Sequence, residues 1–305
     1  MISFPMVHAG GTVDKSRREH RLALGAVILS ALIFSTSAVI IKIVVSYTGP
    51  FTAAGTRYLI AFLFLFTWLR IRRKAAPSIT GSTWLRFLLV GVLTAVASGS
   101  IFFALKTVSA TTASLAFCLT PIPALLSGTI WLKERLGLWQ LSGLAIAVGG
   151  SVLFFSLQWE QGQALAIGLL ILFVLADSTV VVIARSVART HQVGSLDLTA
   201  YPIGIAGCLL FSLGAVLEGL PSMPLHAWGI IVGLAIVNTG IGFLLFNYSL
   251  RHLTAIEAYV VTNLSPFGTV LISWATFGER LLPLQIAAML VALTGVSLVQ
   301  YRKRN

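Results

Sequence analysis

Apolar residues gather along this chain into long runs, and the short breaks between the runs carry most of the charged and turn-forming residues. A helix needs about 20 apolar residues to cross roughly 30 Å of hydrocarbon, so each run of that length predicts a membrane-spanning helix. The pattern therefore predicts an all-α integral membrane protein with ten transmembrane helices. The predicted spans are residues 22–46, 51–69, 83–106, 109–132, 137–156, 163–187, 198–218, 227–249, 254–277 and 281–300.

Composition makes lipid the solvent for most of the chain. Of its 305 residues, 57% are apolar and 10% are charged, whereas about 25% of residues are charged in soluble proteins. Too few charged side chains are present to cover a soluble globular fold, which excludes that class. A formal charge of +12 would suggest a nucleic-acid partner in a soluble protein. Here the basic residues lie in the breaks between apolar runs, so we expect no nucleic acid.

The basic residues predict the topology. With residues 1–21 as a cytoplasmic tail, 17 of the 21 Lys and Arg lie at the inner ends of the predicted spans. The four at the outer ends are Lys42, Arg57, Lys106 and Arg280. The positive-inside rule therefore predicts that both termini are cytoplasmic and that the number of spans is even.

The sequence also repeats itself once. At an offset of 145 residues, the third to fifth spans resemble the eighth to tenth, and at an offset of 143 the first span resembles the sixth. Each copy holds five spans, an odd number, so the second copy enters the membrane from the opposite face. We expect two inverted five-helix domains, residues 22–157 and 163–301. Many secondary transporters have this architecture, with the binding site between the halves near the midplane.

Both copies carry a motif that resembles the EamA domain of the drug/metabolite transporter (DMT) superfamily. In the first copy the motif is Ala104-Leu105-Lys106-Thr107-Val108-Ser109-Ala110, then Pro121 and Lys133-Glu134-Arg135-Leu136; the second has Ser249-Leu250-Arg251, Pro266 and Gly278-Glu279-Arg280-Leu281. Within the superfamily the chain is most similar to the YddG type of ten-helix bacterial exporters of aromatic and other amino acids. The resemblance implies an exporter of the cytoplasmic (inner) membrane, with a central cavity lined chiefly by spans one, three, four, six, eight and nine and no cofactor.

Polar residues inside the predicted spans are the candidates for a site. Asp177 is the only acid well inside a span, and burying it in hydrocarbon costs several kcal/mol. It is either a site for a proton or a substrate ammonium, or an acid at the cavity wall with no coupling role. Four hydroxyl residues recur mid-span in both copies: Ser35, Thr36, Ser178 and Thr179. They either bond a carbonyl or a neighbouring helix, or bind the carboxylate and ammonium of a zwitterion.

Two further repeat-related pairs are candidates. Pro121 and Pro266 occupy matched mid-span positions, where each removes a backbone donor and predicts a kink. Such a bend acts as a hinge or gate, or only shapes the cavity. Phe103 and Tyr248 are either walls of a pocket for apolar side chains or packing residues.

These residues favour a secondary transporter that exports amino acids and similar small metabolites by alternating access, with protons as a possible coupling ion. The alternative is efflux of drug-like or quaternary cationic compounds, for which a cavity rich in acids and aromatic rings would be expected. An intramembrane enzyme is disfavoured, because no histidine lies mid-span and Asp177 has no second acid for a dyad. Cys118 and Cys208 have no Cys or His at ligand spacing, so no metal site is expected. The absence of a P-loop motif excludes ATP-driven transport by this chain alone.

Overall fold

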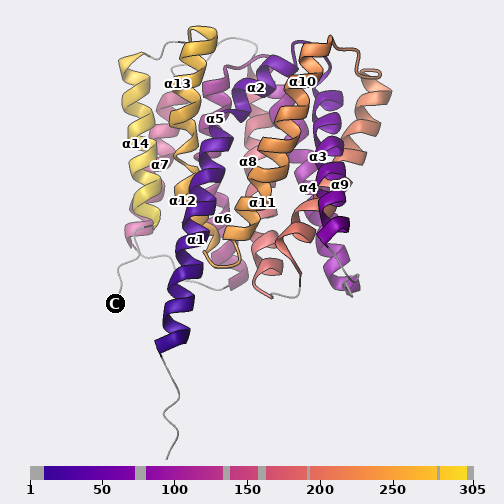
Figure 1. Ribbon diagram of the computed structural model, residues 1–305. Helices are drawn as coiled ribbons and strands as arrows, with labels where there is room; N and C mark the ends of the chain where they lie inside the picture. Colours follow the sequence, from indigo (N-terminus) through magenta and orange to yellow (C-terminus); the bar gives the residue numbers. More distant parts are fainter. Residues whose placement is uncertain are drawn as a thin grey trace, which may run out of the picture.

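The computed structural model describes residues 10–72, 80–132, 138–156, 163–190, 193–279 and 282–300. Every regular element in these ranges is a helix, as the apolar runs predict, and the helices stand side by side in one bundle (Figure 1). Some residues of the predicted tail and motifs lie outside the described ranges: residues 1–9, Lys133, Glu134, Arg135, Arg280 and 301–305.

The helices of the first half are α1 (Gly10–Ser35), α2 (Ser37–Val44), α3 (Pro50–Arg72), α4 (Gly81–Ala104), α5 (Ala110–Phe117), α6 (Pro121–Leu132) and α7 (Leu138–Ser156). Those of the second half are α8 (Ala164–Ala188), α9 (Ser195–Leu217), α10 (Leu225–Gly233), the π-helix η1 (Leu234–Gly242), α11 (Phe243–Ser249), α12 (Ala255–Thr262), α13 (Ser265–Phe277) and α14 (Pro283–Gln300).

Six helical stretches in the described ranges are long and apolar enough to cross a membrane: residues 18–44, 50–72, 81–104, 164–188, 195–217 and 225–249. They coincide with the first three predicted spans and with the sixth to eighth. The other four predicted spans correspond to shorter helices or to pairs of helices separated by a turn. The chain is thus a multi-pass membrane protein.

Three of the expected spans are interrupted rather than continuous. The chain breaks at Thr36 between α1 and α2, at residues 118–120 between α5 and α6, and at residues 263–264 between α12 and α13. Pro121 is the first residue of α6, and Pro266 is the second residue of α13. Proline is tolerated in the first turn of a helix because the N–H it lacks would have no partner there. The sequence predicts a kink at these prolines. The structure instead has a break in the helix, and each proline lies in the first turn of the helix that follows the break.

Helix α7 packs against α14, its equivalent in the second half. A Cβ placed on Gly295 would lie 2.2 Å from the nitrogen of Ala147, and one on Gly150 would lie 2.5 Å from the nitrogen of Ala292. At the offset of 145 residues these two contacts are copies of each other. As α14 advances from Ala292 to Gly295, its partner on α7 moves back from Gly150 to Ala147. The two helices therefore run antiparallel, as an inverted repeat requires.

Helices α3 and α9 form the second such pair, on the opposite side of the bundle in Figure 1. A Cβ on Gly55 would lie 2.3 Å from the nitrogen of Phe211, and one on Gly214 would lie 2.5 Å from that of Thr52. Small residues let backbones approach this closely and drive helix association in lipid, where helices gain no hydrophobic free energy from contact. The two glycine crossings therefore join the halves on either side of the bundle.

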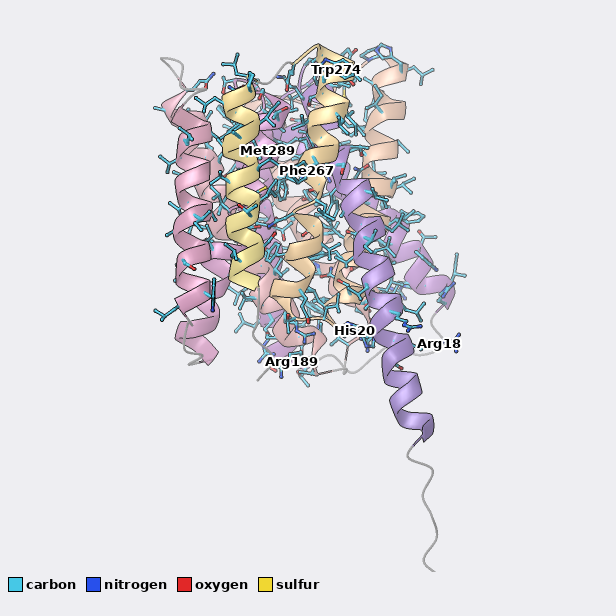
Figure 2. All side chains as sticks on the ribbon, turned by 90° about the vertical axis from the view of Figure 1, so that its left-hand side faces the viewer. Arg18, His20, Arg189, Phe267, Trp274 and Met289 are labelled. Carbon is cyan, nitrogen blue, oxygen red and sulfur yellow. The ribbon has the colours of Figure 1, made fainter. Side chains whose placement is uncertain are left out.

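Charged and aromatic residues mark the two ends of the bundle. Arg18, His20 and Arg189 lie at one end, and Trp274 lies at the other (Figure 2). Arg18 and Arg189 belong to the set of basic residues that the positive-inside rule assigns to the cytoplasm. Both residues lie at the same end of the bundle, as residues on one side of a membrane must. Which side of the membrane this is stays a prediction.

Candidate functional site

A cavity lies in the middle of the bundle, with walls from both halves. Its volume is about 140 Å³, which corresponds to roughly ten water molecules. Residues of α1 to α5 and of α8, α9 and α11 to α13 line it. A space of this size accommodates a small metabolite.

The cavity walls are related by the internal repeat. Phe34 and Asp177 are equivalent at the offset of 143, and both line the cavity. The same holds at the offset of 145 for Ser114 with Tyr259. Equivalent residues line one cavity where the axis that relates the two repeats passes through it. The cavity therefore lies at the interface of the halves, where inverted-repeat transporters bind their substrates.

Asp177 lies near the middle of α8, thirteen residues after Ala164 and eleven before Ala188. The hydroxyl of Tyr259 on α12 donates to its carboxylate Oδ2 at 3.2 Å and lies at the same distance from its backbone carbonyl. The acid thus faces the cavity, away from hydrocarbon, and contacts α12, another helix of the second half. This placement leaves both interpretations of Asp177, coupling site or wall residue, open.

Arg57 also lines the cavity, whereas the sequence predicts an outer position for it, where it either snorkels or lines an outer vestibule for carboxylate-bearing substrates. It is the eighth residue of α3 and only 4% exposed, although the topology argument placed it among the outer cations. Its Nε donates to Thr239 Oγ1, and its guanidinium lies 5.5 Å from the ring centre of Tyr58 and 5.6 Å from that of Phe102. The signal that could have found it is its depth, two helical turns inside an apolar helix.

The π-helix η1 forms hydrogen bonds with Arg57 and with the residues on both sides of the break between α1 and α2. Asn238 Nδ2 donates to the carbonyl of Ile33 at 2.8 Å and to the hydroxyl oxygens of Thr36 and Ser37 at 2.8 and 2.9 Å. The next residue, Thr239, accepts from Arg57. π-helical turns occur frequently at functional sites. Here one π-helical segment directs two consecutive side chains at three helices of the first half, α1, α2 and α3.

The four predicted hydroxyl residues form bonds within their own helices. Ser35 donates to the carbonyl of Ala31 at 3.0 Å, and Thr36 donates to that of Ile33 at 2.8 Å. Ser178 and Thr179 both donate to the carbonyl of Leu175, at 2.9 and 2.8 Å. None of the four lines the cavity, whereas their neighbour Ser37 does. This geometry is the local bonding that was one of the two expectations, and their role in binding stays a prediction.

The other predicted residues lie close to the cavity but not in its wall. The ring centre of Phe103 lies 6.0 Å from that of Phe51, and the ring of Tyr248 lies 5.4 Å from that of His252. The preceding residues, Phe102 and Asn247, are also repeat equivalents, and both line the cavity. Pro121 and Pro266 are buried next to breaks whose residues Thr120 and Asn263 line it.

A polar contact joins the halves at the end of the bundle that the topology argument places outside. Lys42 Nζ of α2 lies 3.1 Å from Glu279 Oε1, just beyond α13. The other carboxylate oxygen of Glu279 accepts from Thr111 Oγ1 at 2.9 Å, and the nitrogen of Ala110 lies 3.4 Å from Oε1. One carboxylate thus holds α2 and the start of α5 together.

Within the described residues, no group of three or more His, Cys, Asp or Glu side chains is arranged to hold a metal ion. The cavity wall offers hydrogen-bonding groups, charges and aromatic faces.

Comparison with known proteins assigns the family. The model of the EamA-like transporter family matches residues 21–156 and again residues 164–301. The chain is 22% identical over 262 residues to the uncharacterized transporter YyaM of Bacillus subtilis, covering 84% of this chain and 86% of YyaM. It is 23% identical over 196 residues to a probable terminal-alkyne amino-acid exporter of Streptantibioticus cattleyicolor, covering 64% of this chain and 65% of the exporter.

A solved structure titled "Crystal structure of protein" has the same fold, with a TM-score of 0.70 at 18% identity, covering 93% of this chain and 99% of that chain. The family match spans nearly the whole chain in two consecutive copies, and the members of this family are transporters. The chain therefore belongs to the EamA-like transporter family of the DMT superfamily and is a transporter, not an enzyme.

Proposed function

We propose that this protein is a secondary transporter that exports amino acids and similar small metabolites across the cytoplasmic membrane by alternating access. The observation that carries the proposal is the cavity at the interface of the two repeats, where Asp177 and its equivalent Phe34 face the same space. A site shared by two inverted halves can be exposed to either side of a membrane by the same motion of one half or the other.

The proposal includes the membrane arrangement. Each broken or π-interrupted stretch counts as one span: α1 with α2, α5 with α6, α10 with η1 and α11, and α12 with α13. The chain then crosses the membrane ten times, as two five-helix repeats at residues 22–157 and 163–301, with both termini in the cytoplasm. The breaks before Pro121 and Pro266 serve as hinges or gates, because i→i−3 hydrogen bonds interrupt the regular α-helical pattern there.

Amino acids are favoured as substrates for two reasons. One relative carries the name of an amino-acid exporter. The cavity also combines apolar and aromatic walls, which suit a side chain, with charged and amide groups, which suit the polar backbone of an amino acid.

Efflux of quaternary or drug-like cations is the second candidate. The observation that favours it is the set of aromatic rings in the same cavity as Asp177, because cations are attracted to ring faces and to acids. The cavity rings are those of Phe34, Tyr58, Phe102, Phe117, Phe173, Phe243, Phe246 and Tyr259. Arg57 in the same cavity opposes a purely cationic substrate, so we rank this function second.

Counterflow in liposomes tests the proposal. Vesicles with the purified full-length protein are loaded with unlabelled phenylalanine or alanine and diluted into the labelled compound, and tetraphenylphosphonium is tested in the same way. We expect transient accumulation of the amino acids above the level of protein-free vesicles. Accumulation of the cation together with no accumulation of either amino acid would contradict the proposal and favour the second candidate.

A further inference from the structure

Arg57 is a buried cation with unused donors. Only 4% of the residue is exposed, and it lines the cavity. In the described part of the chain, no carboxylate lies within ion-pair distance of the guanidinium, and Thr239 is the one hydrogen-bond acceptor it has, at Nε. A guanidinium carries five N–H donors in a planar fork, so with Nε bonded to Thr239 the two Nη groups retain the bidentate pair that carboxylates accept.

The chain fixes the orientation of this fork. Thr239 holds Nε from η1, and the rings of Tyr58 and Phe102 flank the guanidinium. The hydroxyl of Tyr58 is itself hydrogen-bonded to Ser98 Oγ. A positioned cation loses little conformational entropy when an anion binds, which raises affinity. A charged group at this depth is costly without an anionic partner, and the described side chains do not supply one.

A second donor in the cavity wall also lacks a partner. Asn263, at the break between α12 and α13, is 4% exposed, and its Nδ2 has no hydrogen-bond acceptor in the structure. Leaving a buried amide donor unpaired costs free energy. Asn263 lines the cavity, so an acceptor on a bound molecule would satisfy it.

The acceptor side of the cavity is Asp177. Among the described residues, its carboxylate has one hydrogen-bond donor, Tyr259, at 3.2 Å, and no cation within ion-pair distance. The cavity thus presents an unpaired cation and amide together with an unpaired anion. A ligand that complements all three carries a carboxylate and an ammonium group.

We propose that this cavity selects zwitterions, with the substrate carboxylate on the Arg57 guanidinium and the Asn263 amide and the substrate ammonium on Asp177. The inference rests on the proposed function and names its substrate class: compounds with both a free carboxylate and a free amine. Esters and amines that lack the carboxylate leave Arg57 unpaired, and N-acyl compounds leave Asp177 unpaired.

Derivatives of one amino acid test this with the wild-type protein. Counterflow of labelled phenylalanine in liposomes is competed by unlabelled phenylalanine, phenylalanine methyl ester, phenethylamine or N-acetylphenylalanine. We expect each derivative to compete roughly 10- to 100-fold more weakly than phenylalanine, the size expected for a lost hydrogen bond to a charged group. A methyl ester that competes as well as phenylalanine would overturn the proposal.

Variants separate binding by Arg57 from a structural role. Arg57→Gln should weaken competition by phenylalanine roughly 10- to 100-fold and leave competition by its methyl ester unchanged. Asn263→Ala should weaken phenylalanine by about 2- to 10-fold, since a neutral hydrogen bond is lost. Arg70→Gln is the matched control: it lies on the same helix, is exposed, and its guanidinium lies over the ring of Phe66 at 4.7 Å, outside the cavity wall.

The outcomes distinguish a failure of zwitterion selection by Arg57 from a failure of the proposed function. If amino acids are transported but Arg57→Gln weakens phenylalanine and its ester equally, Arg57 only supports the fold, and zwitterion selection by this residue is overturned while amino-acid transport stands. If neither phenylalanine nor alanine is transported and tetraphenylphosphonium is, the proposed function fails, and the inference fails with it.

Discussion

Replacing Gly295 with alanine adds one methyl group at the closest approach of α7 and α14. The new Cβ would lie 2.2 Å from the nitrogen of Ala147, 2.7 Å from its Cα and 2.7 Å from the carbonyl oxygen of Gly143. Ordinary contact begins at 3.4 Å, so the shortest of these distances falls about 1.2 Å short. All three atoms are backbone, so no side chain can rotate away and the helices must separate.

Overpacking of this kind costs typically 1–3 kcal/mol. Alanine itself favours a helix over glycine by about 0.8–1.0 kcal/mol, which offsets part of that cost. Because all three close atoms are backbone, the overpacking cost lies at the upper end of its range, and we expect Gly295→Ala to destabilise the protein by about 2 kcal/mol. Because α7 and α14 join the two halves, the expected consequence is a lower Tm of the purified protein in detergent.

The matched control lies on α7 itself. A Cβ on Gly149 meets nothing within 4 Å, so Gly149→Ala should leave the Tm unchanged or raise it slightly through helix propensity. The measurement is the thermal unfolding of both variants, followed by intrinsic fluorescence in the same detergent. Equal Tm values for the two variants would refute the close antiparallel contact of the repeat equivalents.

Two further predictions concern the transport cycle. Asp177→Asn should keep phenylalanine counterflow at saturating substrate, with a raised KM, and should lose any response to an imposed pH gradient; a wild-type protein that ignores the gradient would instead be a facilitator with no proton coupling. Cysteines replacing Lys42 and Glu279, whose charged atoms lie 3.1 Å apart, should react with a membrane-impermeant reagent from outside only. Cross-linking them with a short bifunctional thiol reagent should stop transport, and full activity after complete cross-linking would show that this contact never opens.

The all-α membrane-protein class and the internal duplication were predictable from the sequence because both depend on local or periodic properties. Long apolar runs depend only on span length and hydropathy, and the offset of 145 aligns Pro121 with Pro266 directly. The glycine contacts of α7 then follow the same offset. The π-helical turn at residues 234–242 could not be predicted, because nothing in its composition distinguishes it from the α-helices on either side.

The candidate site was harder to predict. In a helix that is apolar all round, hydropathy does not fix which face turns toward a cavity. The predicted pair Phe103 and Tyr248 is therefore one residue away from the pair in the wall, Phe102 and Asn247. A hydroxyl such as that of Ser178 can donate to a carbonyl of its own helix instead of to a substrate. The sequence does not indicate which of the two acceptors it uses. Arg57 was expected at the outer end of its span because the charge asymmetry counted it as a topology signal, although it lies inside α3 and lines the central cavity.

The reciprocal crossing of α7 and α14 has a thermodynamic consequence. Suppose that the cavity turns from one side of the membrane to the other when the two repeats exchange conformations. The Gly150–Ala292 contact then takes the geometry of the Gly295–Ala147 contact, and the reverse, so the pair of contacts is unchanged. Its free energy is then the same before and after the exchange, so it cancels from the equilibrium between the two orientations. The Lys42–Glu279 contact has no such invariance. In such an exchange the crossing would set how firmly the halves hold together, and the Lys42–Glu279 ion pair would bias which side of the membrane the cavity faces.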